Sequence, residues 1–137
     1  MSKSILRFMI PKSLVEYITI DSSVRQALEK MHFHKYTAIP VLDSDGKYIG
    51  TLRNDDIIDC IMNDGTFNKF KAEEIPVGKI LKTSSVKSLM HNASFEDMVD
   101  CVREHNFVPI VDDRGCFIGI ILRREILGRL LNHIKEI

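Results

Sequence analysis

The pattern of hydrophobic and polar positions is organised around residues 36–58, YTAIPVLDSDGKYIGTLRNDDII. Two short runs rich in β-branched and aromatic residues, 38–42 and 48–52, flank the dipeptide Asp45-Gly46. An Asp-Gly pair between two such runs is a strong signal for a β-hairpin. A helix is expected to begin at Asn54. This stretch therefore predicts a strand, a tight turn, a second strand and a helix.

The same pattern occurs again 69 positions later, in residues 108–127, VPIVDDRGCFIGIILRREIL. Several residues are identical in the two copies at this offset. The identical pairs are Pro40 and Pro109, Asp43 and Asp112, Gly46 and Gly115, Ile49 and Ile118, and Gly50 and Gly119. Self-similarity at a fixed period indicates that the chain contains two copies of one folding unit.

Amphipathic helices are predicted before and after both hairpins. The segment from Ser23 to Gln26 resembles a capping box, and Ser94 can cap the corresponding second helix. In the helices before the hairpins, apolar residues follow at i, i+3, i+4 and i+7, which is the spacing of one helix face. These two sets are Val24, Ala27, Leu28 and Met31, and Phe95, Met98, Val99 and Val102. The helices after the hairpins also match each other, with Ile57, Ile58, Ile61 and Met62 against Ile126, Leu127, Leu130 and Leu131.

Short strands are expected at 15–20 and 86–90, and a short helical segment at 4–10. Each half then has the order β-α-β-β-α, so we predict an α+β fold. Because a sheet of two or three strands is marginal alone, we expect the two motifs to pack sheet to sheet about a pseudo-twofold axis, with a crevice along it. The predicted limits are motif 1 with its N-terminal helical segment at 1–66, a linker at 67–76, and motif 2 with its C-terminal helix at 77–137.

Composition and charge narrow the classes of partner. The 137 residues include 19 Lys plus Arg and 19 Asp plus Glu, so no basic field favours nucleic acid. The three cysteines form no CxxC pair and are expected to be reduced thiols of a cytoplasmic protein. No apolar run approaches the length of a membrane span, and the N-terminus lacks the apolar region of a signal peptide. We therefore expect neither a membrane nor a nucleic-acid partner.

Catalytic and metal-binding patterns are not found. His32 and His34 are expected to point to different faces at the end of a helix, so no metal site is predicted. The acidic pair Asp55-Asp56 has no partner for acid–base chemistry and is expected to cap a helix. No glycine-rich phosphate loop or nucleophile elbow is present. We therefore expect no enzyme activity and no catalytic cofactor.

The repeated sequence motif resembles a tandem pair of cystathionine β-synthase (CBS) domains, the Bateman module. The resemblance is carried by IPVLD…DGKYIGTLRNDD and VPIVD…RGCFIGIILRRE and covers about residues 5–134. It implies a sensor of adenosine nucleotides in which strand backbone groups read the base and a carboxylate clamps the ribose. Many family members close that clamp with a Ser/Thr-x-x-Asp motif.

The chain departs from this clamp motif in both copies. The hydroxyl positions hold Arg53 and Leu122, whereas the acidic positions hold Asp56 and Glu125. Arginines near these positions would suit phosphate groups, because guanidinium forms bidentate contacts with them. The alternative is that they only form a solvated start of a helix. The residues for a clamp or a second cleft are Arg53, Asp56, Glu125, Val108 and Pro109.

A narrower resemblance links the chain to small stand-alone CBS proteins of Gram-positive bacteria that bind cyclic di-AMP. It rests on the N-terminal segment FMIP, on the segment YTAIPVLD and on the RRE-containing segment near the C-terminal helix. Tyr36 could stack on a purine and Thr37 could donate a hydrogen bond, or both could be ordinary strand residues. The cleft that this resemblance implies is lined by Ile10, Val15, Glu16, Tyr36, Thr37, Ala38, Ile39, Pro40, Arg123 and Arg124.

The functional expectation is a non-catalytic regulatory sensor. The favoured ligand is cyclic di-AMP, with AMP, ADP or ATP next, bound in the cleft between the motifs. We expect a homodimer through the closing helices and a regulated protein partner. The alternative is a structural dimerisation or docking module whose nucleotide cleft does not function.

Overall fold

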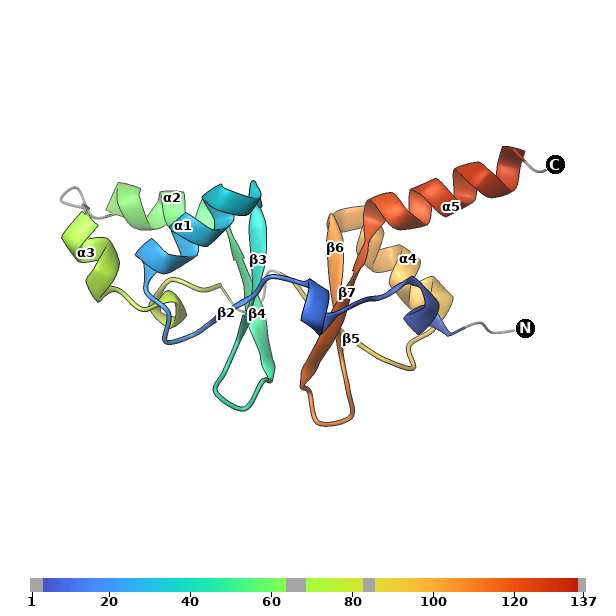
Figure 1. The fold of residues 1–137 in the computed structure, drawn as a ribbon, viewed down its shortest axis with the longest axis horizontal. Coiled ribbons are helices and arrows are strands. Elements are labelled where there is room, and N and C mark those ends of the chain that lie inside the picture. Colours follow the sequence, from blue (N-terminus) through green and yellow to red (C-terminus); the bar gives the residue numbers. More distant parts are fainter. Residues whose placement is uncertain (1–3, 64–68, 83–85, 136–137) are drawn as a thin grey trace. The chain divides into compact units, whose positions relative to one another are not determined.

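The computed structural model describes residues 4–63, 69–82 and 86–135, which form two compact units. Unit 2 comprises residues 16–85, and unit 1 combines residues 1–15 with residues 86–137. Each unit has helices packed on a small sheet, as Figure 1 shows. The predicted α+β class is confirmed.

Unit 2 has a three-stranded sheet in the order β2-β3-β4, with β2 parallel and β4 antiparallel to β3. The core residues contributed by α1 and α2 lie together on one face of this sheet. In chain order the elements are β2 (Ile18–Thr19), α1 (Val24–His34), β3 (Ala38–Leu42), β4 (Tyr48–Arg53), α2 (Asn54–Asn63), α3 (Lys69–Glu74) and the 3-10 helix η3 (Val77–Lys79).

Unit 1 repeats this arrangement with one additional strand at the edge, in the order β1-β7-β6-β5. The strand β1 pairs antiparallel with β7, and β5 runs parallel to β6. In chain order the elements are the 3-10 helix η1 (Ile5–Phe8), β1 (Ile10–Pro11), the 3-10 helix η2 (Lys12–Leu14), β5 (Leu89–Met90), α4 (Phe95–Glu104), β6 (Phe107–Val111), β7 (Phe117–Leu122) and α5 (Arg123–Lys135).

The predicted hairpins are both present, and their turns use the same chemistry. Gly46 and Gly115 have φ of 84° and 83°, a region that glycine enters without steric cost. An aspartate at the start of each turn accepts backbone hydrogen bonds. In the second turn the Oδ1 atom of Asp112 accepts from the N–H groups of Arg114 and Cys116, each at 2.9 Å. These bonds, the one from Cys116 foremost, hold the pKa of Asp112 below its ordinary value.

The predicted helix caps are also confirmed. The Oγ atom of Ser23 accepts a hydrogen bond from the backbone N–H of Gln26 at 3.1 Å, and the Gln26 side chain accepts from the N–H of Ser23 at 2.9 Å. This reciprocal pair is a complete capping box at the start of α1. Ser94 caps α4 by accepting from the N–H of Asp97 at 3.1 Å.

Three segments differ in detail from their predicted form. The strands expected at 15–20 and 86–90 are only two residues long, and the helical segment expected at 4–10 is a single 3-10 turn followed by β1.

Residues 67 and 68 of the predicted linker lie outside the described residues, and most of its remainder forms α3. The backbone of residues 75–78 then bonds to residues 20–24, which ties this segment to the sheet of unit 2.

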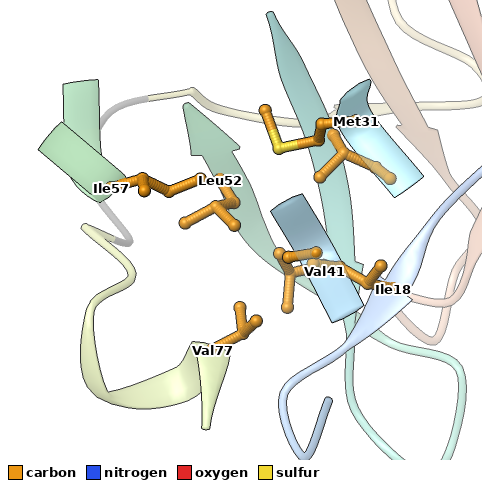
Figure 2. Packing of buried hydrophobic residues seen from close by; sticks show 8 residues of the cluster. Ile18, Met31, Val41, Leu52, Ile57 and Val77 are labelled. Carbon is orange, nitrogen blue, oxygen red and sulfur yellow. The ribbon is translucent and has the colours of Figure 1, made fainter. Parts of the chain in front are cut away.

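The core of unit 2 is completed by the segment that follows α3. Val77 is fully buried and packs with residues of the sheet and of both long helices. Figure 2 shows its side chain directed toward Val41 and Leu52. The partly buried Ile80 and Leu81 pack against the same cluster. A residue from the start of the second repeat therefore fills the core beneath the first hairpin.

The core of unit 1 is completed in the corresponding way by the N-terminal segment. Ile5 is fully buried in a cluster with Met98, Ile110 and Ile121, while Phe8 packs at its edge. Ile5 precedes the first hairpin in the sequence but packs beneath the second. The opening segments of the two repeats thus show the same spacing and are exchanged between the two cores.

Gly119 allows β1 to approach β7. An added Cβ atom at this position would lie 2.3 Å from the carbonyl oxygen of Ile10 and 2.7 Å from Cγ of Met9. Carbon atoms do not approach a backbone oxygen so closely, so the strand would have to move. The absence of a side chain at Gly119 therefore permits the observed position of Ile10, one of the predicted binding residues.

We predict that Gly119→Ala lowers the free energy of unfolding by about 1–3 kcal/mol, because the added methyl group overpacks the β1–β7 contact. Gly128→Ala is the matched control, since a Cβ there meets nothing within 4 Å. In the exposed interior of α5 that change should raise stability by about 0.5–1 kcal/mol. Urea unfolding of both variants checks this, and equal stability of the two would contradict the proposed crowding.

Candidate functional site

The predicted site residues divide between the two units. Glu16, the segment 36–40, Arg53 and Asp56 belong to unit 2. The other predicted residues belong to unit 1 and are Ile10, Val15, Val108, Pro109, Arg123, Arg124 and Glu125. The predicted site residues therefore form two local groups, one in each unit.

The strand β3 presents its residues alternately to the core and away from it. Ile39 is fully buried in the core of unit 2, as is Val41. Since side chains alternate along a strand, Ala38 and Pro40 point to the opposite face of the sheet. Of the predicted strand residues, Ile39 can thus offer a ligand only its backbone groups. Val108 holds the corresponding core position in unit 1.

Glu16 lies within a cluster of charged and aromatic side chains beside the C-terminal end of α1. Its carboxylate is 3.1 Å from Nζ of Lys30 and 3.4 Å from Nε2 of His34. The ring of His34 stacks on Tyr36, with centroids 5.3 Å apart and an interplanar angle of 25°. Tyr36 and Thr37 are exposed. Two of the predicted binding residues, Glu16 and Tyr36, therefore contact His34.

Sequence reasoning did not assign Lys30 or His34 to this group. The available signal was their spacing, because residues at i and i+4 lie on the same helix face. The sequence pattern directs attention to His34 only as a neighbour of His32. Among residues 4–63, 69–82 and 86–135, no group of three or more His, Cys, Asp or Glu side chains is placed to hold a metal ion.

The first acidic clamp residue has a structural role at the start of α2. Asp56 is buried, and its Oδ2 atom accepts a hydrogen bond from the backbone N–H of Arg53 at 2.9 Å. Its other oxygen lies 3.8 Å from Nζ of Lys82, which also pairs with Asp59. The hydrogen bond to Asp59 is the main cause that raises the pKa of Lys82. Asp56 therefore caps the helix, as the sequence suggested for this acidic pair.

In unit 1 the predicted residues lie along β7 and the start of α5. Ile10 pairs with Ile120 in the β1–β7 ladder, only a few residues before the arginines. Pro109 is buried and pairs with the same Ile120 across the β6–β7 ladder. The three neighbouring strands β1, β7 and β6 thus bring these side chains close to the point where α5 begins.

Arg123 and Arg124 differ in how far their guanidinium groups are engaged. Arg123 donates to the carbonyl oxygens of Val102 at 2.6 Å and Arg103 at 3.1 Å, and to the side chain of Asn106 at 3.2 Å. It therefore caps the C-terminal end of α4. The guanidinium of Arg124 is exposed and has no hydrogen-bond or ion-pair partner among the described residues. Of these two adjacent arginines, Arg124 is the one whose guanidinium is not engaged within the described residues.

A hollow of about 1150 Å³ lies elsewhere in unit 1, between η1, the start of α4 and α5. Arg7 and Arg129 lie over the ring of Phe8, with their guanidinium carbons 5.3 and 4.7 Å from its centroid. None of the predicted nucleotide residues lines this hollow. Within the described part of the chain, no helix is long and apolar enough to cross a membrane.

Comparison with known proteins gives the family. The model of the CBS domain family matches residues 5–63 and 77–132. Cyclic di-AMP receptor B of Bacillus subtilis is 28% identical over 131 residues, which cover 96% of this chain and 88% of the relative. The chain spans 45% of the length of another curated relative that it matches.

Solved structures agree with this assignment. CbpB of Listeria monocytogenes in complex with c-di-AMP superposes with a TM-score of 0.83 at 26% identity, covering 94% of this chain and 96% of that one. CBSX2 in complex with AMP has a TM-score of 0.76 at 24% identity, covering 94% and 96% of the two chains, which is a likeness of fold. The chain belongs to the CBS domain family and carries two such domains in tandem.

Proposed function

We propose that this chain is a non-catalytic regulatory sensor that binds an adenylyl nucleotide, with cyclic di-AMP as the favoured ligand. The observation that carries the proposal is its 28% identity to cyclic di-AMP receptor B of Bacillus subtilis over 88% of that protein. The resemblance to the Listeria complex with c-di-AMP supports the same ligand. AMP, ADP and ATP are the next candidates.

The proposed contacts follow from which side chains remain available. Arg124 has an unpaired guanidinium suited to a phosphate, and Tyr36 offers a ring already stacked on His34. Thr37 is exposed at the start of β3 and can donate a hydrogen bond. The backbone of residues 38–40 would read the base. The proposed binding residues are those expected from the sequence: Ile10, Val15, Glu16, Tyr36, Thr37, Ala38, Ile39, Pro40, Arg123 and Arg124.

The altered clamp motif favours cyclic di-AMP over a mononucleotide. Neither copy has the hydroxyl of the usual motif, because Arg53 and Leu122 hold those positions. Asp56 is buried and engaged as a helix cap, so the first acidic position offers little to a ribose. A ligand held through its phosphates and bases loses less from these changes than one held mainly through ribose hydroxyls.

Regulation would follow from differential affinity. A ligand shifts a conformational equilibrium only by as much as its affinity differs between the two states. We propose that the nucleotide favours one arrangement of a homodimer and thereby changes the affinity for a protein partner. In this scheme any catalytic activity belongs to the protein partner, and the CBS pair only binds the nucleotide.

The second candidate function is a structural docking module that does not bind nucleotide. The observation that favours it is the loss of both clamp hydroxyls together with the internal use of Asp56 and Arg123. In that case the exposed Arg124 would be part of a solvated helix start. The two candidates differ in whether any adenylyl nucleotide binds.

We predict that isothermal titration calorimetry of the purified chain shows saturable binding of cyclic di-AMP and weaker binding of AMP and ATP. The altered clamp is the physical reason for this order. Cyclic di-GMP serves as the control, because it carries the same phosphates with different bases. Absence of heat with all three adenylyl nucleotides would support the structural candidate. Tighter binding of AMP would show that the ribose contacts do not depend on the missing hydroxyls.

We predict that Arg124→Ala weakens cyclic di-AMP binding by about 10- to 100-fold, since a hydrogen bond to a charged group contributes about 1.5–3 kcal/mol. The melting temperature without ligand should not change, because the side chain has no partner among the described residues. Arg103→Ala is the matched control, an exposed arginine of the same unit with only a 3.9 Å pair to Asp100. An unaltered dissociation constant for Arg124→Ala would remove its phosphate role.

We predict the opposite pattern of stability for Arg123→Ala. This change removes three hydrogen bonds at the end of α4 and should lower the free energy of unfolding by about 1–3 kcal/mol. Chemical denaturation of Arg123→Ala and Arg124→Ala side by side measures the difference. Equal stability would mean that the Arg123 contacts with Val102 and Asn106 do not persist in solution.

A further inference from the structure

The face of α5 that turns toward the core of unit 1 carries basic side chains. Ile126 is buried in this core. Arg129, Leu130 and His133 follow it at i+3, i+4 and i+7, which is the spacing of a single helix face. All four residues line the hollow between η1, the start of α4 and α5. This side of α5 therefore contributes an arginine and a histidine to the wall of the hollow.

A second arginine reaches the same wall from η1. The guanidinium carbons of Arg7 and Arg129 lie 5.3 and 4.7 Å from the centroid of the Phe8 ring, so two like charges share one aromatic ring. Neither arginine has an ion-pair partner among residues 4–63, 69–82 and 86–135. The ring attracts each cation, but the two cations repel one another. An anion in contact with both would replace this repulsion by attraction.

The rest of the wall combines positive charge with apolar surface. Glu96 is the one carboxylate among the described residues that line the hollow, and it pairs with neither arginine. Three apolar side chains of the lining are exposed, namely Leu6, Phe95 and Leu130. A concave site with apolar walls and a few convergent polar groups is the usual form of a small-molecule pocket. This one has the charge to suit an organic anion.

The equivalent positions of unit 2 show that the repeat does not require this arrangement. At the offset of 69, Arg129 corresponds to Cys60. In the opening segments, Phe8 corresponds to Ile80, which packs partly buried against the core of unit 2. One cation has a counterpart in Lys79, whereas the second cation and the ring are added in unit 1. Packing that is common to both units therefore does not explain the pair of arginines on one ring.

We propose that this hollow binds a small organic phosphate, with the phosphate on Arg7 and Arg129 and the organic part against Leu6, Phe95 and Leu130. A phosphate monoester carries a charge of about −1.5 to −2 at pH 7, so one group can balance both guanidinium groups, whereas one carboxylate balances a single cation. Guanidinium also matches the geometry of phosphate oxygens.

This site is additional to the proposed nucleotide site. Its lining lies wholly within unit 1, and none of the residues proposed to bind cyclic di-AMP belongs to it. The volume of about 1150 Å³ exceeds what a phosphate group alone would fill. The proposed ligand therefore has an apolar part as well as its charge.

Phenyl phosphate is the probe, because it joins a phosphate monoester to an aromatic ring. Its titration into the full chain, followed by the amide signals of the residues that line the hollow in ¹H–¹⁵N NMR spectra, should give saturable shifts. Its affinity should be about tenfold higher than that of inorganic phosphate, which lacks the apolar part, or of benzoate, which has a single charge. The absence of saturable shifts, or equal affinity for either comparison ligand, would overturn the proposed ligand class.

Three variants test the assignment of the phosphate to the arginine pair. Arg7→Gln and Arg129→Gln should each weaken phenyl phosphate binding by about tenfold or more, since each removes hydrogen bonds to a charged group. Arg103→Gln is the matched control, because this exposed arginine of unit 1 does not line the hollow. Arg129→Lys keeps the charge without the planar fork and should bind with intermediate affinity. Equal weakening by Arg103→Gln would indicate unspecific attraction and would overturn the site.

The two arginines provide independent versions of this test, because Arg7 and Arg129 come from different elements and neither is buried. If one glutamine variant fails to fold, as shown by its amide spectrum without ligand, the other still decides. Unchanged phenyl phosphate binding in a folded variant would remove the arginine pair from the site.

Competition separates this site from the one proposed for the nucleotide. Saturating cyclic di-AMP should leave the dissociation constant of phenyl phosphate unchanged. Displacement of phenyl phosphate would place the probe in the nucleotide site and would overturn the proposal. If calorimetry shows that the chain binds no nucleotide, the sensor function fails, while the titrations with phenyl phosphate and the arginine variants still decide whether this second site exists.

Discussion

Ile5 and Val77 are fully buried in the two hydrophobic cores, and each comes from the opening segment of the repeat that forms the other core. A sheet of three or four short strands with two helices has little apolar surface to bury by itself. The opening segment that packs on each core therefore buries additional apolar surface, and this burial is a necessary part of the hydrophobic stabilisation. Both opening segments have an apolar residue followed by two more at i+3 and i+4, which suits one 3-10 turn.

This exchange also determines what the chain can present to a ligand. Because residues 1–15 belong to unit 1, Ile10 pairs with β7, the strand that leads into α5. Gly119 is the residue that permits the approach. The same region contains Arg123, which is used to cap α4, and Arg124, which is not used within the described structure. The structural role of Arg123 and the proposed phosphate contact of Arg124 therefore fall on adjacent residues.

The proposed nucleotide site and the expected dimer contact both involve α5. Its first turn carries Arg124, and its exposed apolar residues begin at Leu127, one turn later. A ligand bound at the start of this helix would alter the same element that we expect to contact a second protomer. Such an arrangement would couple nucleotide binding to dimer geometry, provided that the ligand has different affinity for the two geometries.

The sequence alone determined the repeat, both hairpins, the helix caps and the α+β class, because these depend on local spacing. Asp-Gly turns, serine caps and periods of 2 and 3.6 residues are encoded within a few positions of each other. Only the tertiary structure decided that Ile5 and Val77 are exchanged between cores, that Ile39 and Val108 face inward, and that Arg123, Asp56 and Glu16 are engaged internally. Those outcomes depend on contacts between distant segments, and equal residue types such as Arg123 and Arg124 are distinguished only by what packs beside them.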